Sequence, residues 1–269
     1  MSELAQKIES FLMDHIGEKI EQMEEVLLEM PQVDIPVENL FVNGMYARKI
    51  MIPRDTILTG RVHLADYVDI MLSGDITVAT PDGVKRFTGF NIFEGKQGRK
   101  RAGYAHEDTH WVTVHRTEIK DADEYVNAMT VFNMTAYKKI EMDRVGYESF
   151  ISGMGMSEDD VQDQVQNTED FEGVNSENYY LAPSTIHGIG FFAGHNFDIG
   201  GEILIARIGD KRTEAGKFVN HSETPNAEMR HVGGNIYLFA LKEIHRGEEV
   251  TTSYKDTVIK LSGGNICQQ

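Results

Sequence analysis

Apolar residues in the first thirty positions recur at steps of three and four, with Glu, Lys and Gln between them. This spacing predicts one amphipathic helix over residues 2–30, which Pro31 ends. Gly17 lies in its middle and weakens it by about 1 kcal/mol relative to alanine. The helix is expected to pack on the chain or to pair with a second copy, since its acidic polar face disfavours a membrane surface.

Between residues 40 and 115 the pattern changes to short β-type runs separated by turn signals. The runs are YARKIMI, TILTGRVHL, DIMLSGDITVAT, KRFTGFNIF and THWVTVHRTE. Pro81-Asp82-Gly83 between two alternating runs predicts a hairpin, because glycine adopts positive φ easily. Regular short strands of this kind favour an antiparallel barrel or sandwich. Residues 121–150 are expected to be helical or mixed.

Residues 151–177 are acidic and contain no Lys or Arg, and short strands and turns return after Asn178. We therefore predict a mainly β chain in four parts. They are an N-terminal helix and lead-in (1–39), a barrel domain with a helical tail (40–150), an acidic linker (151–177) that holds a short helix around 158–166, and a second β domain (178–269).

Charge is distributed unevenly between these parts. From Asn178 to the end there are 10 acids and 9 Lys or Arg, so almost all of the net charge of −17 lies before that point. An acidic chain does not suit a nucleic-acid backbone. Cys267 is the only cysteine, which excludes a disulfide framework and a cysteine zinc site. The sequence shows no signal peptide and no apolar run long enough to span a membrane, so a cytoplasmic location is expected.

Three polar segments in the last third of the chain carry candidate chemistry. They are HGIGFFA (187–193), GKFVNHSETPN (216–226) and GEEVTTSY (247–254). Gly188 and Gly190 on either side of Ile189 let backbone approach a ligand closely. Asn220 and His221 offer an amide and an imidazole to a polar cofactor, and Tyr254 offers a hydroxyl.

The order and spacing of these segments over residues 178–254 resemble the SET-domain family of protein lysine methyltransferases. The resemblance implies small β-sheets, in which the Asn-His-Ser segment forms a pseudoknot with the final segment. It implies S-adenosyl-L-methionine as cofactor, bound by Gly188, Ile189, Gly190, Asn220 and His221. It also implies Tyr254 as the catalytic residue, with Glu249 as the structural acid of the closing motif.

The acceptor side of such a site is harder to recognise. The family often has Phe-Asp before its final tyrosine, whereas this chain has Thr252-Ser253, and no aromatic residue follows Tyr254. The degree of methylation, the substrate and the groups that close the lysine channel therefore stay open. The N-terminal barrel or a partner subunit would complete the channel, unless the domain is a degraded binder.

Residues 40–118 resemble small cupin-like barrels of bacteriophage and bacterial genomes. Metal-binding members hold their metal with several histidines and a carboxylate on barrel strands. This chain offers only His63 and, later, histidines such as His106, which are too few ligands to predict a metal site.

The SET resemblance implies a protein-lysine N-methyltransferase whose partner is a protein substrate, for which a basic protein is one candidate. The expected location is the cytoplasm, which is the host cytoplasm if the chain is phage-encoded. An oligomer formed through residues 2–30 is possible. Two alternatives stay open: a non-catalytic binding or assembly protein, and a metal-dependent cupin enzyme with an accessory SET-like unit.

Overall fold

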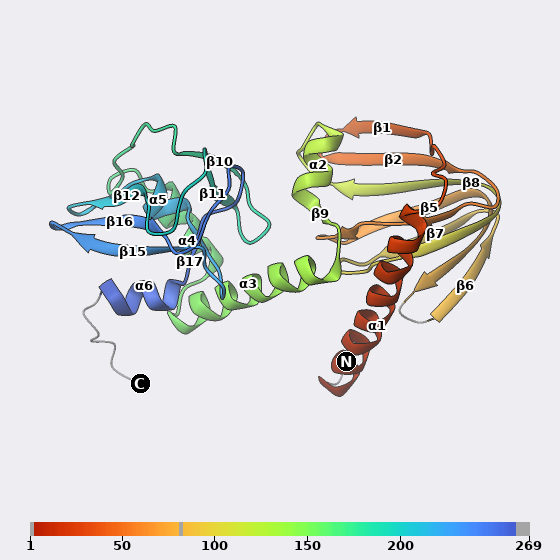
Figure 1. The fold of residues 1–269 in the computed structure, drawn as a ribbon, viewed down its shortest axis with the longest axis horizontal. Coiled ribbons are helices and arrows are strands. Elements are labelled where there is room, and N and C mark those ends of the chain that lie inside the picture. The colour runs from red at the N-terminus through yellow and green to blue at the C-terminus, as the bar shows by residue number, and fades with distance from the viewer. Residues whose placement is uncertain (1–2, 81–82, 262–269) are drawn as a thin grey trace. The chain divides into compact units, whose positions relative to one another are not determined.

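The computed structural model describes residues 3–80 and 83–261 and divides the chain into two compact units, Met1–Lys138 and Lys139–Gln269 (Figure 1). The first unit contains α1 (Glu3–Leu28), β1 (Val37–Val42), β2 (Met45–Ile52), β3 (Ile57–Thr59), β4 (Val62–His63), β5 (Tyr67–Thr80), β6 (Gly83–Thr88), β7 (Asn91–Gly95), β8 (Ala102–Arg116), α2 (Ala122–Met129) and β9 (Thr130–Val131). Helix α3 (Met134–Gly153) runs across the division. The second unit continues with α4 (Glu158–Gln166), β10 (Tyr179–Pro183), β11 (Ile189–Ala193), β12 (Glu202–Ile208), β13 (Lys211–Arg212), α5 (Glu214–Phe218), β14 (Asn220–His221), β15 (Ala227–Val232), β16 (Asn235–Ala240), β17 (Thr251–Thr252) and α6 (Tyr254–Leu261). No helix among the described residues combines the length and the apolar character that a membrane crossing requires.

Helix α1 confirms the predicted N-terminal helix, and it packs within the first unit. Glu21 accepts a hydrogen bond from the Met134 N–H (2.6 Å), and Glu24 pairs with the buried Lys100 amine (2.8 Å). Gly17 serves this packing, because a Cβ there would lie 2.6 Å from Met134 Cγ. These contacts support the packing role of the helix, and its pairing with a second copy stays a prediction.

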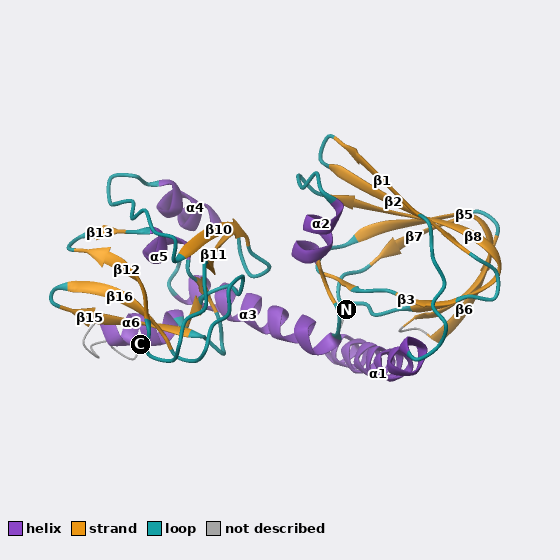
Figure 2. Cartoon of the chain, turned by 45° about the horizontal axis from the view of Figure 1, so that its top comes forward, coloured by secondary structure: helices purple, strands orange, loops and turns teal. Residues whose placement is uncertain are grey.

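The first unit is built on one seven-stranded antiparallel sheet that curls on itself (Figure 2). Its longest strands, β5 and β8, pair along most of their length, and register shifts bend them between Met71 and Ile76. Gly74 lies at the bend with a φ of +114°, and a Cβ there would lie 2.6 Å from Thr109 Cα. One half of the sheet is extended by β1, β2 and β7 and the other by β3 and β6, so apolar side chains from both halves share one core.

Most predicted strands of this unit are present, but β1 and β9 were not predicted and β8 is longer than expected. The predicted runs TILTGRVHL and KRFTGFNIF each contain two strands, β3 with β4 and β6 with β7. β5 and β6 pair up to Thr80 and Gly83, whose φ is +104°, while Pro81 and Asp82 of the predicted hairpin turn lie outside the described residues. β8 begins at Ala102, well before the predicted run at Thr109. Its first half was not recognised because its buried positions are small residues among charged ones, and β1 was missed altogether.

The second unit consists of small sheets, as predicted. A four-stranded antiparallel sheet runs in the order β13-β12-β16-β15, beside the hairpin β10-β11 and the parallel pair β14-β17. Its core is formed by fully buried side chains such as Phe191, Ile203, Leu238 and Val250. Buried and half-buried positions alternate along β16, whereas β11 and β12 each contain two adjacent buried residues.

The division between the units lies upstream of the predicted acidic linker, 151–177. Within that stretch α4 is the short helix expected there, and the Ser157 side chain caps it by accepting a hydrogen bond from the Asp160 N–H (3.2 Å). The second unit begins earlier because α3 bonds into it. Asp143 is buried and accepts hydrogen bonds from Ser222 Oγ (2.9 Å) and the Glu223 N–H (3.0 Å). The change in charge at residue 178 therefore does not coincide with the division.

Candidate functional site

The polar segments 216–226 and 247–254 lie against each other in the second unit. β14 and β17 pair in parallel, with Asn220 opposite Thr251 and His221 opposite Thr252. The Ser222 N–H continues this ladder to the Thr252 carbonyl (3.0 Å). Parallel neighbours need a crossover connection, which the hairpin of β15 and β16 supplies. Two segments well separated in the sequence thus form one continuous surface.

Asn226 holds this arrangement from the end of the first segment. Its side chain is 8% exposed, and its amide group donates to the Glu249 carbonyl (2.8 Å). Its side-chain oxygen accepts from the Thr251 N–H (2.7 Å). An amide carries both a donor and an acceptor, so one side chain satisfies two backbone groups of the facing segment.

Glu249 joins the same surface to the glycine-containing turn. Its Oε1 accepts hydrogen bonds from Ser184 Oγ (2.7 Å) and Asn220 Nδ2 (2.9 Å). Asn220 also donates to the His187 carbonyl (2.9 Å). Burial raises the pKa of the Glu249 carboxyl above its ordinary value, and the two donors only partly oppose this. The Glu249 carboxyl group thus fixes both Ser184 at the start of the turn and the Asn220 amide.

The two glycines of the turn have different roles. Gly188 has a φ of +49°, and its carbonyl accepts a hydrogen bond from the Ser184 N–H (2.9 Å), which closes the turn. Gly190 lies in β11 opposite Ala182. A Cβ at Gly190 would overlap the Glu249 carboxyl, so the glycine there makes room for that group.

Tyr254 begins helix α6, just after β17 ends at Thr252. Its hydroxyl donates to the Val219 carbonyl (3.1 Å), and its backbone N–H donates to His221 Nδ1 (3.2 Å). His221 Nδ1 is therefore an acceptor, so the ring proton lies on Nε2, which donates to Glu223 Oε1 (3.1 Å). Burial, and then the neighbouring Tyr147, raise the pKa of the Tyr254 hydroxyl far above its ordinary value. Tyr254 is a neutral phenol at physiological pH.

A cavity of about 430 Å³ opens beside these groups. Four of the six predicted site residues line it: Gly188, Ile189, Asn220 and Tyr254. Gly190 and His221 do not line the cavity. They support it, the first by its close approach to Glu249 and the second by its hydrogen bond to Tyr254.

Thr252 adds an unsatisfied polar group to the cavity wall. It is 1% exposed, and its Oγ1 has no hydrogen-bond partner within the described residues. A buried hydroxyl without a partner is unfavourable by about 1–3 kcal/mol. A polar molecule in the cavity would remove that penalty, so this wall is suited to a ligand with hydrogen-bonding groups.

Helix α3 contributes aromatic side chains that the sequence analysis did not assign to the site. Phe150 and Tyr147 both line the cavity, and their rings meet the Tyr254 ring edge-on at centroid distances of 5.3 and 6.3 Å. The Tyr147 ring also stacks on His187 (4.5 Å). The two residues are three positions apart in a segment expected to be helical, so a shared face was predictable, but not what it would face.

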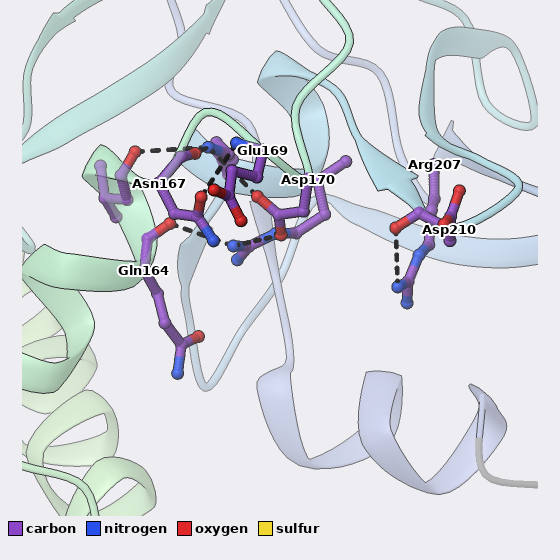
Figure 3. A network of polar contacts seen from close by, with 9 residues as sticks. Gln164, Asn167, Glu169, Asp170, Arg207 and Asp210 are labelled. Atoms are coloured by element: carbon purple, nitrogen blue, oxygen red, sulfur yellow. Dashed lines mark hydrogen bonds and ion pairs between the residues drawn. The ribbon is translucent and has the colours of Figure 1, made fainter.

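Basic residues on another side of the cavity are held by the acidic stretch. Arg212 lines the cavity and bonds the Asp170 carboxylate (2.7 Å) and the Gln164 carbonyl (3.0 Å). Lys217, also in the wall, contacts the Asn167 carbonyl and lies 3.6 Å from Asp170. Figure 3 shows the labelled Gln164, Asn167 and Asp170 converging in this network. Part of the predicted linker is therefore built into the site.

The structure does not bring the weak metal candidates together. His63 stacks on His115 (4.9 Å between ring centroids), whereas His106 Nε2 bonds Thr77 Oγ1 (2.8 Å). Among residues 3–80 and 83–261 no three His, Cys, Asp or Glu side chains form a group that could hold a metal ion.

Comparisons with known proteins add a family match. The family model described as "SET domain" matches residues 112–255, which is more than half of the chain. A search among curated proteins found no match.

Solved structures with a similar fold cover the N-terminal third of the chain. KdgF from Halomonas sp. is 14% identical, with 34% of this chain and 87% of that chain covered and a TM-score of 0.30. A cupin-2 domain-containing protein from Shewanella frigidimarina NCIMB 400 is 13% identical, with coverages of 35% and 89% and a TM-score of 0.27. A cupin domain from Bordetella pertussis Tohama I is 16% identical, with coverages of 33% and 98% and a TM-score of 0.28.

Proposed function

The chain belongs to the SET-domain family, and from that premise we propose that it is an S-adenosyl-L-methionine-dependent protein-lysine N-methyltransferase. SET domains are in general protein lysine methyltransferases that act on protein substrates. The observation that carries the proposal is that Gly188, Ile189, Asn220 and Tyr254 line the same cavity of about 430 Å³. One space thus contains both the candidate cofactor-binding groups and the candidate catalytic hydroxyl.

The cavity wall suits this cofactor on grounds of its own chemistry. A Cβ at Gly188 would have open space around it, so the turn leaves room for a ligand, and Asn220 presents an amide fixed by Glu249. The Thr252 hydroxyl needs a hydrogen-bond partner, which a polar cofactor would supply. We assign cofactor contact to Gly188, Ile189 and Asn220, and assign Gly190 and His221, predicted as cofactor-binding, to holding these groups in place.

We assign Tyr254 to the transfer point. When bound, S-adenosyl-L-methionine supplies a methyl group on a positively charged sulfur, which departs as a neutral thioether. The acceptor lysine must arrive without its proton, although a free lysine amine has a pKa of about 10.4. Burial raises the pKa of the Tyr254 hydroxyl, so we assign it a positioning role and not that of a base. Its oxygen, held by the bond to the Val219 carbonyl, orients the amine, and the buried surroundings favour the neutral amine.

Helix α3 provides the aromatic wall that the segment around Tyr254 lacks. Tyr147 and Phe150 meet the Tyr254 ring within the cavity. Aromatic faces exclude water from an alkyl chain and tolerate a cationic product. We therefore propose that these two residues line the path of the lysine side chain. The substrate would then be a protein with an accessible lysine, and an oligomer formed through residues 2–30 remains part of the proposal.

Calorimetric titration with S-adenosyl-L-methionine tests the proposal first. Saturable binding to the full chain is expected, and absence of binding at high protein concentration would contradict the cofactor assignment and favour a non-catalytic binding protein.

The second test is Tyr254→Phe, which should lower the methylation of proteins in a bacterial lysate at least 100-fold while changing cofactor affinity by less than about threefold. Tyr180→Phe is the matched control, since Tyr180 is 44% exposed and lies outside the cavity wall. Equal turnover in the two variants would remove Tyr254 from the mechanism.

A further inference from the structure

The curled sheet of the first unit encloses a second cavity, of about 400 Å³. It lies between the two halves of the sheet, and apolar side chains from both halves line it, among them Ile52 on β2 and Val78 on β5. Tyr46, Trp111 and Tyr125 add aromatic surface. A cavity of this size and lining fits a small organic molecule with an apolar body.

Positive charge is concentrated in this cavity. Four arginines line it, against one acidic residue, in a chain whose net charge is −17. The arginines are Arg48, Arg61, Arg99 and Arg101. In an acidic protein such a group of guanidinium ions is not explained by overall composition. It creates a local field that favours an anion.

The single acid, Asp69, does not neutralise the group. Its carboxylate is 3% exposed and already accepts hydrogen bonds from Arg101 (2.8 Å), Trp111 Nε1 (2.8 Å) and Thr113 Oγ1 (2.9 Å). Arg48 is exposed, and its guanidinium makes no hydrogen bond or ion pair with the described residues. Asp69 thus fixes Arg101 in place, whereas the exposed Arg48 keeps its N–H donors available.

Two imidazoles in the same wall add unsatisfied polar atoms. His63 and His115 stack at a centroid distance of 4.9 Å, and the buried Nδ1 of each has no hydrogen-bond partner within the described residues. His115 is 3% exposed. Burial, followed by the nearby His115 and arginines, lowers the pKa of His63 to about 3, and burial lowers that of His115 to about 4. Both rings are therefore neutral, and each can offer a hydrogen bond to a guest.

We propose that the cavity of the first unit binds a small organic anion, with a carboxylate or phosphate held by Arg48 and the neighbouring arginines and an apolar body lying against the aromatic wall. Planar guanidinium groups match carboxylate and phosphate oxygens in pairs. The unpartnered imidazole nitrogens complete the polar end, and Trp111 and Tyr125 contact the body. This site is separate from the cavity proposed for methyl transfer and does not depend on it.

The chain offers a direct reporter for this site. Trp111 is the only tryptophan, and it lines the cavity. Its fluorescence in the full chain should change saturably with benzoate, with hexanoate or with phenyl phosphate. The first two represent a carboxylate head and the third a phosphate head. Benzyl alcohol, which has the same ring without charge, should bind at least tenfold more weakly.

Substitutions locate the charge requirement. Arg48→Gln should weaken binding of the best anion about tenfold, which corresponds to about 1.4 kcal/mol. Arg116→Gln is the matched control, because Arg116 is an exposed arginine that follows His115 on β8 and does not line the cavity. His63→Phe keeps the ring stack and removes the free nitrogen, and should also weaken binding. The proposal is overturned if none of the three anions gives a saturable change, if benzyl alcohol binds equally well, or if Arg48→Gln and Arg116→Gln bind alike.

Discussion

Asn226 is the residue whose loss should most clearly separate the two polar segments of the second unit. Asn226→Ala leaves the Glu249 carbonyl and the Thr251 N–H without partners in a buried position. Each orphaned buried group is unfavourable by about 1–3 kcal/mol, so the second unit should lose roughly 2–6 kcal/mol of unfolding free energy. Cofactor affinity should fall as well, because Asn220 and Thr252 lie on the paired strands that Asn226 holds.

Urea unfolding followed by far-ultraviolet circular dichroism measures this loss. Asn235→Ala is the matched control, since Asn235 accepts one exposed hydrogen bond from the Gly209 N–H (3.1 Å) that water replaces, and its expected loss is below about 1 kcal/mol. Trp111 fluorescence reports on the first unit, so its transition should keep its midpoint in both variants. An Asn226→Ala loss no larger than that of Asn235→Ala would refute the reasoning that these two backbone bonds hold the segments together.

Three further predictions concern stability. Burial raises the pKa of the Glu249 carboxyl, so its contribution to stability is complete below about pH 4.5 and is lost as the pH rises through the folded-state pKa. Glutamine does not titrate, so the melting temperature of Glu249→Gln relative to that of the parent should rise between pH 4 and pH 8 in calorimetry. The pKa of His115 is lowered to about 4, so the unfolded chain takes up a proton below about 6.5 that the folded chain refuses. Stability should fall as the pH drops from 6.5 towards 4, and His115→Phe should flatten that fall in melts followed by Trp111 fluorescence. Gly17→Ala should destabilise the protein by about 1 kcal/mol, because overpacking against the Met134 side chain outweighs the gain in helix propensity. Gly153→Ala is the control, since a Cβ there has open space and should not destabilise the protein. Equal effects of the two substitutions in thermal melts would contradict the packing role of Gly17.

Much of the second unit could be predicted because its informative residues have local causes. The sequence itself marks Gly188 as a residue that can adopt the positive φ found in the turn. It also places Asn220 next to His221, and the structure has both on one short strand. Short apolar runs between turn residues predicted the strands around Phe191 and Leu238, whose side chains are fully buried. The short helix α4 lies at the expected residues, and the Ser157 side chain that caps it is a local feature of the sequence.

What the sequence did not predict depends on contacts between distant segments. The close approach of Gly190 to the Glu249 carboxyl comes from strand packing, and a Gly-x-Gly pattern alone does not distinguish it from a turn glycine. Asp143 lies in a helix rich in charged residues, so nothing local marks it as the buried acceptor for Ser222. Likewise, Asp170 belongs to an acidic run whose composition predicts a solvent-exposed linker, although its carboxylate holds Arg212 beside the cavity.

Thr252 and helix α3 are best understood together. Thr252 is 1% exposed and stands where the family often has an aromatic residue, so this strand position contributes a small polar group to the cavity wall. Tyr147 and Phe150 of α3 meet the ring of Tyr254 within the same cavity. The aromatic surface therefore comes from upstream of the motifs, and the family match from residue 112 to 255 contains that helix. A fragment that begins at residue 178 would lack this wall, so the functional unit must include α3.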